Sequence, residues 1–163
     1  MNEYEYKGNK YTLKPDVLEL FRDGIELIIG RKKLMFEETK NINSSLILQY
    51  EKQHKELLRS KSKAEKSDKG LSEIEKQIEE LQYKYETDPE VHSILTHTTG
   101  CVENAMLKLV LDKKLIPEVI PKLIEGDKET YNFNDIEFSK NVVSKVVNDF
   151  FFLMMTHRDI LPH

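Results

Sequence analysis

The fold class is decided by one stretch, Leu71-Ser-Glu-Ile-Glu-Lys-Gln-Ile-Glu-Glu-Leu-Gln-Tyr-Lys-Tyr85. Its apolar residues follow one another at steps of three and four: Leu71, Ile74, Ile78, Leu81 and Tyr85. Such steps place the residues along one a/d seam of a helix, with Glu and Lys at the positions between them. The stretch therefore predicts a helix with a coiled-coil stripe, and it favours a mainly α fold.

A weaker form of the same seam lies just upstream, in residues 46–64. Between the two arms stands Ser67-Asp68-Lys69-Gly70, where Gly70 allows the chain to reverse its direction. Together the arms predict an antiparallel helical hairpin that protrudes from a helical domain, within residues 31–87. The upstream seam consists of Leu46, Tyr50, Gln53, Leu57, Lys61 and Ala64.

The two arms also carry opposite charge. Residues 52–70 hold seven basic and three acidic side chains, whereas residues 71–90 hold two basic and seven acidic ones. An antiparallel hairpin brings these charges side by side, while a parallel dimer would pair each arm with its like. The charge pattern therefore favours the intramolecular hairpin, with a solvated charged helix that has no partner as the alternative.

The start of the chain predicts a short β-hairpin. Two alternating runs are separated by Gly8-Asn9, residues that take the positive φ of a two-residue turn. With this loop, Tyr6 pairs with Tyr11 and Tyr4 pairs with Leu13, and the four side chains share one face. An isolated two-stranded ribbon is marginally stable in water, so that face must cover either the helices of this chain or another chain.

The remaining segments predict helices. Residues 15–30 show helical spacing, with Gly30 as the stop and Gly24 as a costly interior residue. Asp88-Pro89-Glu90 is a strong helix start, because Asp caps helices and Pro fits the first position. The helix that follows can pause at Gly100. We expect a single domain over residues 1–163, made of a β-hairpin (1–14), a first helix (15–30), the long helical hairpin (31–87) and C-terminal helices (88–163).

The final predicted helix, residues 135–155, is the most apolar and has Ile136 on its inward side. It contains six consecutive apolar residues, Phe150-Phe-Phe-Leu-Met-Met155, which wrap its whole circumference. Either this helix is central in the fold, or part of the run is a contact surface for another protein. Phenylalanine and methionine suit an adaptable apolar face that binds peptides.

Composition argues against several classes of partner. A net charge of -4 gives no overall field that would hold nucleic acid. The run of six apolar residues is far shorter than the roughly 20 that span a bilayer. Cys101 is the only cysteine, and the first residues lack the features of a signal peptide. We therefore expect a cytoplasmic protein with neither a nucleic-acid nor a membrane partner.

No catalytic signature is visible in the chain. His97 and Cys101 have the i, i+4 spacing that can share a metal, with His92 on the same stretch, but no further ligand stands at metal spacing. Cys101 as a nucleophile lacks an orienting group, and a lone cysteine beside an apolar helix is more often a small buried hydrophobe. We therefore expect no enzyme activity, no metal and no cofactor.

The N-terminal stretch Glu5-Tyr-Lys-Gly-Asn-Lys-Tyr-Thr-Leu-Lys14, followed by a helix with Leu18, Leu20 and Phe21, resembles the start of phage tail assembly chaperones. These proteins often begin with a short hairpin and then become helical. The resemblance implies a non-enzymatic virion assembly factor that binds the long tape-measure protein of a growing tail and shields its apolar helices. The helical hairpin would then mediate self-association into a homo-oligomer or contact a second tail component. The protein-binding residues implied are Tyr6, Tyr11, Phe150, Phe151 and Met154, all as hydrophobic contacts.

Two other functions stay open at this point. One is a small phage-type inhibitor or effector that binds a host enzyme or ligand, for which a polar pocket would be expected. The other is a structural component of the virion, with the helical hairpin as an interlocking arm.

Overall fold

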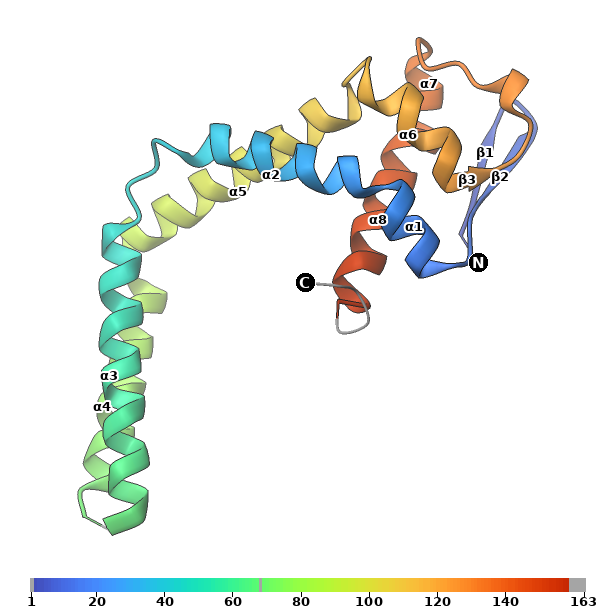
Figure 1. Ribbon diagram of the computed structural model, residues 1–163. Coiled ribbons are helices and arrows are strands. Elements are labelled where there is room, and N and C mark those ends of the chain that lie inside the picture. The colour runs from blue at the N-terminus through green and yellow to red at the C-terminus, as the bar shows by residue number, and fades with distance from the viewer. Residues whose placement is uncertain (1, 68, 159–163) are drawn as a thin grey trace. The chain divides into compact units, whose positions relative to one another are not determined.

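The computed structural model describes residues 2–67 and 69–158 and confirms a mainly α protein with an N-terminal β-hairpin (Figure 1). Its internal contacts divide the chain into two compact units. Of the described residues, 2–38 and 102–158 form unit 1, and 39–67 and 69–101 form unit 2. None of the helices in the described residues has both the length and the apolar character that a bilayer span needs.

The β-hairpin of unit 1 joins β1 (Glu3–Tyr6) to β2 (Asn9–Leu13). Its turn is Lys7-Gly8, with φ values of 49° and 79°, so the predicted Gly8-Asn9 loop is wrong by one residue. The correction follows from turn chemistry: in a turn with two positive φ values, glycine is favoured at the second position. Tyr4 consequently pairs with Tyr11 and not with Leu13.

The face of the hairpin survives this correction, because each partner moves by two residues and the side-chain period of a strand is two. Tyr4, Tyr6, Tyr11 and Leu13 are all buried, as predicted. A third strand, β3 (Ile124–Glu125), adds antiparallel to β2 and was not predicted. The hairpin therefore covers the chain's own residues, which decides between the two alternatives left by the sequence.

The helix predicted over residues 15–30 differs from the observed structure in both its interior and its end. It is divided at Gly24 into α1 (Val17–Asp23), capped by Asp16, and α2 (Ile25–Thr39). Gly30 does not end it: a Cβ at that position would lie 3.2 Å from Leu109 and 3.3 Å from Leu115. Gly30 therefore serves close packing inside a continuing helix, and residues 31–39 belong to α2 instead of the helical hairpin.

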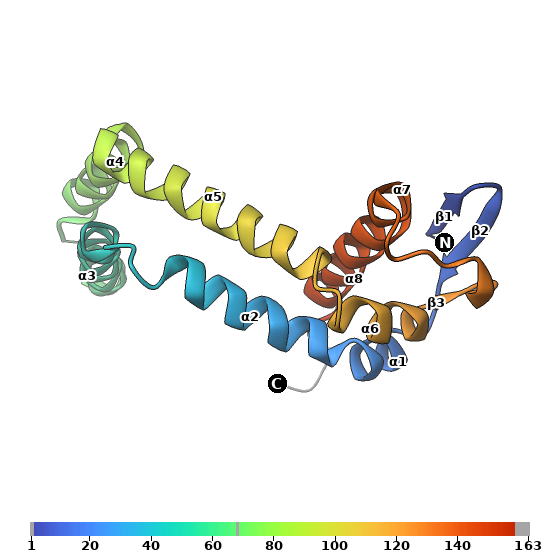
Figure 2. The same cartoon turned by 90° about the horizontal axis from the view of Figure 1, so that it is seen from above.

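The C-terminal segment is helical, as predicted, with local departures. The helix α5 runs through Gly100 without a pause, and Asp135 is the N-cap of α7. A π-helical stretch joins α7 to α8, so that the two form one continuous rod (Figure 2). The elements are α5 (Pro89–Val110), α6 (Leu115–Leu123), a 3-10 turn (Lys128–Thr130), α7 (Ile136–Phe138), the π stretch (Ser139–Val143) and α8 (Ser144–Thr156).

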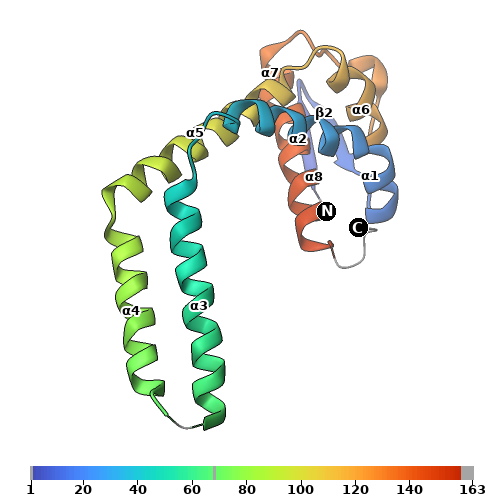
Figure 3. The same cartoon turned by 60° about the vertical axis from the view of Figure 1, so that its left-hand side comes forward.

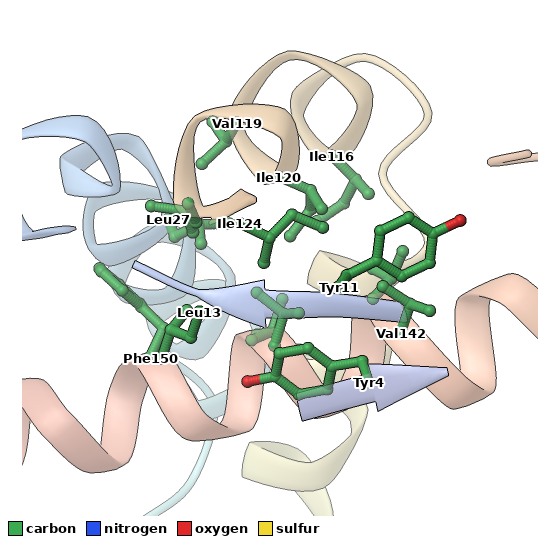
Figure 4. Close-up of a cluster of buried hydrophobic side chains, with 14 of the residues drawn as sticks. Tyr4, Tyr11, Leu13, Leu27, Ile116, Val119, Ile120, Ile124, Val142 and Phe150 are labelled. Carbon is green, nitrogen blue, oxygen red and sulfur yellow. The ribbon is translucent and has the colours of Figure 1, made fainter. Parts of the chain in front are cut away.

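The core of unit 1 lies between the β-hairpin, α6 and the α7–α8 rod. Tyr4, Tyr11 and Leu13 project from the hairpin toward the side chains of the two helical elements (Figure 4). An aromatic cluster completes it, with Phe138 in edge contact with Tyr6 and Tyr11. Other core members shown in Figure 4 are Leu27, Ile116, Val119, Ile120, Ile124, Val142 and Phe150.

Unit 2 contains the predicted antiparallel helical hairpin, α3 (Ser45–Ser67) and α4 (Leu71–Thr87), which lie side by side (Figure 3). Gly70, with a φ of 75°, ends the turn between them, as predicted. Tyr50 packs edge-on against Tyr85 across the seam, with ring centroids 5.3 Å apart. Lys61 and Glu75 form an ion pair of 4.0 Å between the arms. Tyr50 and Tyr85 of the predicted seam thus meet between the arms, and the opposite charges of the arms meet in this ion pair.

Two tyrosine hydroxyls donate long-range hydrogen bonds to the aspartates that precede α5 and α7. Asp88 accepts the Glu90 backbone N–H with one oxygen and the Tyr50 hydroxyl with the other, at 2.9 and 2.8 Å. Asp135 does the same with the Glu137 backbone N–H and the Tyr6 hydroxyl, at 3.0 and 2.5 Å. Each carboxylate is thus both a helix cap and the acceptor of a long-range side-chain bond.

Candidate protein-binding surfaces

The structure places most of the predicted contact residues in the interior of unit 1. Tyr6, Tyr11, Phe150 and Met154 are brought together in the core of unit 1, where they are buried. Phe151 is half-buried, and the Arg31 guanidinium stands over its ring at 4.8 Å from the centroid. The cause is that the β-hairpin and α8 cover each other, so the apolar faces that the sequence offers to a partner satisfy one another instead. Four of the five side chains are thus covered by the chain itself, and Phe151 alone among them stays partly exposed.

The sequence allowed the run Phe150–Met155 to be either a central core helix or a contact surface, and each description fits part of the run. Phe150 and Met154 lie in the core, whereas Phe152 and Met155 leave 62% and 66% of their surface exposed. This division is expected for a helix that packs on one side only. The outward side of α8 therefore still presents a small apolar patch.

A concave apolar feature of unit 1 lies between the C-terminal end of α5, α6 and α7. A groove of about 270 Å³ opens there. Leu111 and Ile136 stand at it with 58% and 76% of their surface exposed, and Phe133 forms part of its wall. Polar and charged residues complete the border, so that an apolar floor is rimmed by polar groups. The remaining lining residues are Val110, Asp112, Lys113, Ile116, Pro117, Asn134 and Ser139.

Local sequence explains why Ile136 is exposed although it was predicted to face inward. It is the first residue of α7, directly after the N-cap Asp135, and the inward positions of the rod are taken by Phe138, Val142 and Val143. The helical spacing did not show this, because Ile136 lies at a step that is compatible with the apolar face of the helix. The exposed pair Leu111 and Ile136 was therefore missed from sequence.

Asp135 precedes Ile136 in the chain but does not line the groove, and its carboxylate is held by neighbouring groups. The hydroxyl of Tyr6 and the backbone N–H of Glu137 both donate to Asp135, and they lower the pKa of its carboxyl below the usual range. Lys7 lies 3.6 Å from the same carboxylate. Asp135 is thus an ionised helix cap held in place by three contacts, with Tyr6, Glu137 and Lys7.

Unit 2 has a second apolar groove, along one side of the helical hairpin. It measures about 270 Å³ and is lined by Tyr50, Glu51, His54, Leu81, Gln82 and Tyr85. The opposite side of the hairpin is more polar, with Gln53, Glu56, Ser60, Gln77, Glu80 and Lys84 around Leu57 and Leu81. The two faces of the same helix pair therefore differ in chemistry.

A third cavity in unit 2 is polar and measures about 320 Å³. His97 lines it, and its Nε2 lies 3.9 Å from the Sγ of the buried Cys101. No group of three His, Cys, Asp or Glu side chains within residues 2–67 and 69–158 stands close enough to hold a metal ion. The other lining residues are Asn41, Ile42, Asn43, Ser45, Leu46, Glu90, Ser93 and Ile94.

In comparisons with known proteins, no protein-family model, no curated protein and no solved structure matches this chain. Function is therefore inferred from the side chains themselves. Among them, the apolar groove of unit 1 combines the strongest exposure of large apolar residues with a concave surface.

Proposed function

We propose that the protein is a non-enzymatic binding factor that shields an apolar helical client, in the manner of a phage tail assembly chaperone. The observation that supports this most is the groove of unit 1, where Leu111 and Ile136 stand exposed beside an apolar cavity. Burying the exposed 58% of Leu111 and 76% of Ile136 against a partner would contribute about 1–2 kcal/mol each. A surface of this kind is costly to leave in water, so a partner that covers it is favoured.

A helical client fits the chemistry of this groove. Helix-in-groove recognition places side chains at i, i+3, i+4 and i+7 of an amphipathic helix against an apolar floor, while polar residues meet at the rim. Here Phe133 and Ile116 belong to the apolar lining, and Asp112 and Lys113 belong to the polar lining. The resemblance of the N-terminal hairpin to tail assembly chaperones points to the same kind of client, a tape-measure protein. The place of action is then the cytoplasm of the host cell.

An aggregation assay tests this function. A polypeptide rich in amphipathic helices is diluted from denaturant, and its light scattering is followed with and without the protein. We expect the wild-type protein to suppress scattering and the double variant Leu111→Gln, Ile136→Gln to suppress it much less. The control is Leu107→Gln, since Leu107 is 57% exposed but does not line the groove. Scattering that is unaffected by the wild-type protein would contradict the proposal, as would a turnover reaction abolished by His97→Ala or Cys101→Ala.

A second candidate function rests on the polar cavity of unit 2. Its asparagine, serine and histidine side chains suit a small hydrogen-bonding ligand, which is the feature expected of an effector or inhibitor. Affinity purification from the native source separates the two functions. Recovery of a metabolic enzyme or a nucleotide favours the effector, whereas recovery of a tail component favours the chaperone. A structural role in the virion requires the protein in purified particles.

A further inference from the structure

We propose that the helical hairpin of unit 2 pairs face to face with the hairpin of a second copy of this chain, with both tips at the same end of the assembly. The inference concerns α3 and α4 alone and does not depend on the client groove of unit 1. It follows from three features of the hairpin: incomplete burial, one apolar side, and complementary rows of charge.

The hairpin buries little of its own apolar surface. Across α3 only Tyr50 and Ala64 are buried, and α4 has no buried residue at all. Ile74, Ile78 and Leu81 in the seam are only half-buried. Two helices shield each other along one line, so a second layer is needed to cover seam residues from the side.

The apolar side groove identifies which face a second layer would cover. Glu51 and His54 of α3 line it, and Ile47 and Leu58 extend the same row at steps of four, three and four. Leu58 leaves 44% of its surface exposed. The opposite face has glutamines and a serine in the corresponding places. The face with Tyr50, Leu58 and Tyr85 is therefore the apolar one.

The charges of the hairpin favour a second copy of the chain as the partner that covers this face. Next to the apolar row, α3 presents an exposed row at steps of four, three and four: Lys55, Arg59, Ser62 and Lys66. On the same side of the hairpin, α4 presents another such row: Glu75, Glu79, Gln82 and Glu86. Because each chain carries one basic and one acidic row, two copies complement each other without any other protein.

The same charges fix the symmetry of the pair. A two-fold axis parallel to the helices lays α3 of one copy over α4 of the other, so that basic rows face acidic rows at both edges. Within the hairpin Lys61 stands opposite Glu75, so Lys55 is level with residue 81 and Arg59 with residue 77. In the pair, Lys55 would therefore lie within one helical turn of the second copy's Glu79, and Arg59 within one turn of its Glu75. A two-fold axis across the helices would instead set α3 over α3 and like charges together. The first arrangement is therefore favoured, with the two tips side by side.

A charge-swap experiment on the full chain tests the pairing. Variant A is Lys55→Glu, Arg59→Glu, and variant B is Glu75→Lys, Glu79→Lys. By sedimentation velocity over a concentration series, we expect the wild type to dimerise. We expect A and B alone to dissociate at least about tenfold more readily, and an equimolar mixture of A and B to recover the dimer. The matched control Glu56→Lys, Glu80→Lys makes the same charge change as B on the polar face and should leave the dimer intact.

Several outcomes would overturn the proposal: a monomeric wild type over the whole series, a control as weak as B, or a mixture that stays monomeric. A distance measurement keeps the test independent of whether the variants fold. Spin labels at Ser72→Cys, near the tip, in a Cys101→Ala background should lie about 20 Å apart across two helix layers. Tips at opposite ends would be separated by about 35 Å, the length of α3, and that distance would also contradict the proposed symmetry.

Discussion

Replacing Gly24, between α1 and α2, by alanine should destabilise the protein, although its negative φ of -102° suits alanine. A Cβ at this position would lie 2.4 Å from Cε2 and 2.5 Å from Cζ of Phe150, and 2.9 Å from the carbonyl oxygen of Leu20. Ordinary contact begins at 3.4 Å, so the Phe150 ring would have to move by about 1 Å. That ring is completely buried, and a close-packed core offers it no free space.

The magnitude follows from two opposing terms. Overpacking of a core costs about 1–3 kcal/mol, whereas exchanging glycine for alanine at a position with negative φ gains at most about 1 kcal/mol by restricting the unfolded chain. A net loss of about 1–2 kcal/mol is therefore expected. For a chain of this size each kcal/mol corresponds to a fall in Tm of about 2–4 °C.

Urea denaturation followed by far-UV circular dichroism measures this loss against a matched control. At Gly100, inside α5, nothing lies within 4 Å of an added Cβ, so Gly100→Ala should stabilise the protein by about 0.5–1 kcal/mol. Phe150→Leu removes the clashing ring atoms, and its cost should shrink when Gly24→Ala is already present. Equal effects of the two alanine substitutions, or a strictly additive double variant, would refute this reasoning.

Three further predictions concern the seam, a cap and the aromatic residues. Ile74→Ser with Ile78→Ser should lower both helicity and thermal stability, by about 1–2 kcal/mol per half-buried side chain; no change in either would show that the seam is wrongly assigned. The hydrogen bond from the Tyr50 hydroxyl lowers the pKa of Asp88 in the folded protein. The ionised carboxylate therefore stabilises the fold above its ordinary pKa of 3.8, and this stabilisation is lost as the pH falls through the lower folded-state pKa. Tyr50→Phe should make the decline of Tm below about pH 4 shallower, and an unchanged profile would argue against the bond. Phe138→Ala should cost about 3–5 kcal/mol and the exposed Phe152→Ala less than about 0.5 kcal/mol, and calorimetry that ranks them the other way would contradict the core described above.

Local periodicity was sufficient to predict the helical hairpin of unit 2. Its seam at Leu71, Ile74 and Ile78 depends on helical steps and on Gly70, which are properties of neighbouring residues. The face of the β-hairpin was predictable for the same reason, since alternation survives a shift of two residues. Its turn was not predictable in the same way. The composition Gly8-Asn9 indicated a loop at these two residues, but the turn is formed by Lys7 and Gly8, which places glycine at the second of the two positions with positive φ.

The burial of the residues expected to contact a partner could not be predicted, because it depends on which apolar surfaces of the chain meet in space. Tyr11 and Phe150 belong to elements at opposite ends of the chain, and the sequence did not show that they would share a core. Gly30 resembled a helix stop for the same reason, since its contacts with Leu109 and Leu115 are long-range. Ile136 was assigned to the inside by its spacing, whereas the position of Phe138 in the aromatic cluster turns it outward.

The proposed binding role depends most directly on whether the groove of unit 1 takes an apolar helix. Fluorescence anisotropy of a labelled model peptide, with leucine at i, i+3, i+4 and i+7, measures this without a natural client. We predict saturable binding to the wild type and to Leu107→Gln, and at least about tenfold weaker binding to Leu111→Gln, Ile136→Gln. Absence of binding to the wild type, or equal binding to all three proteins, would contradict the account.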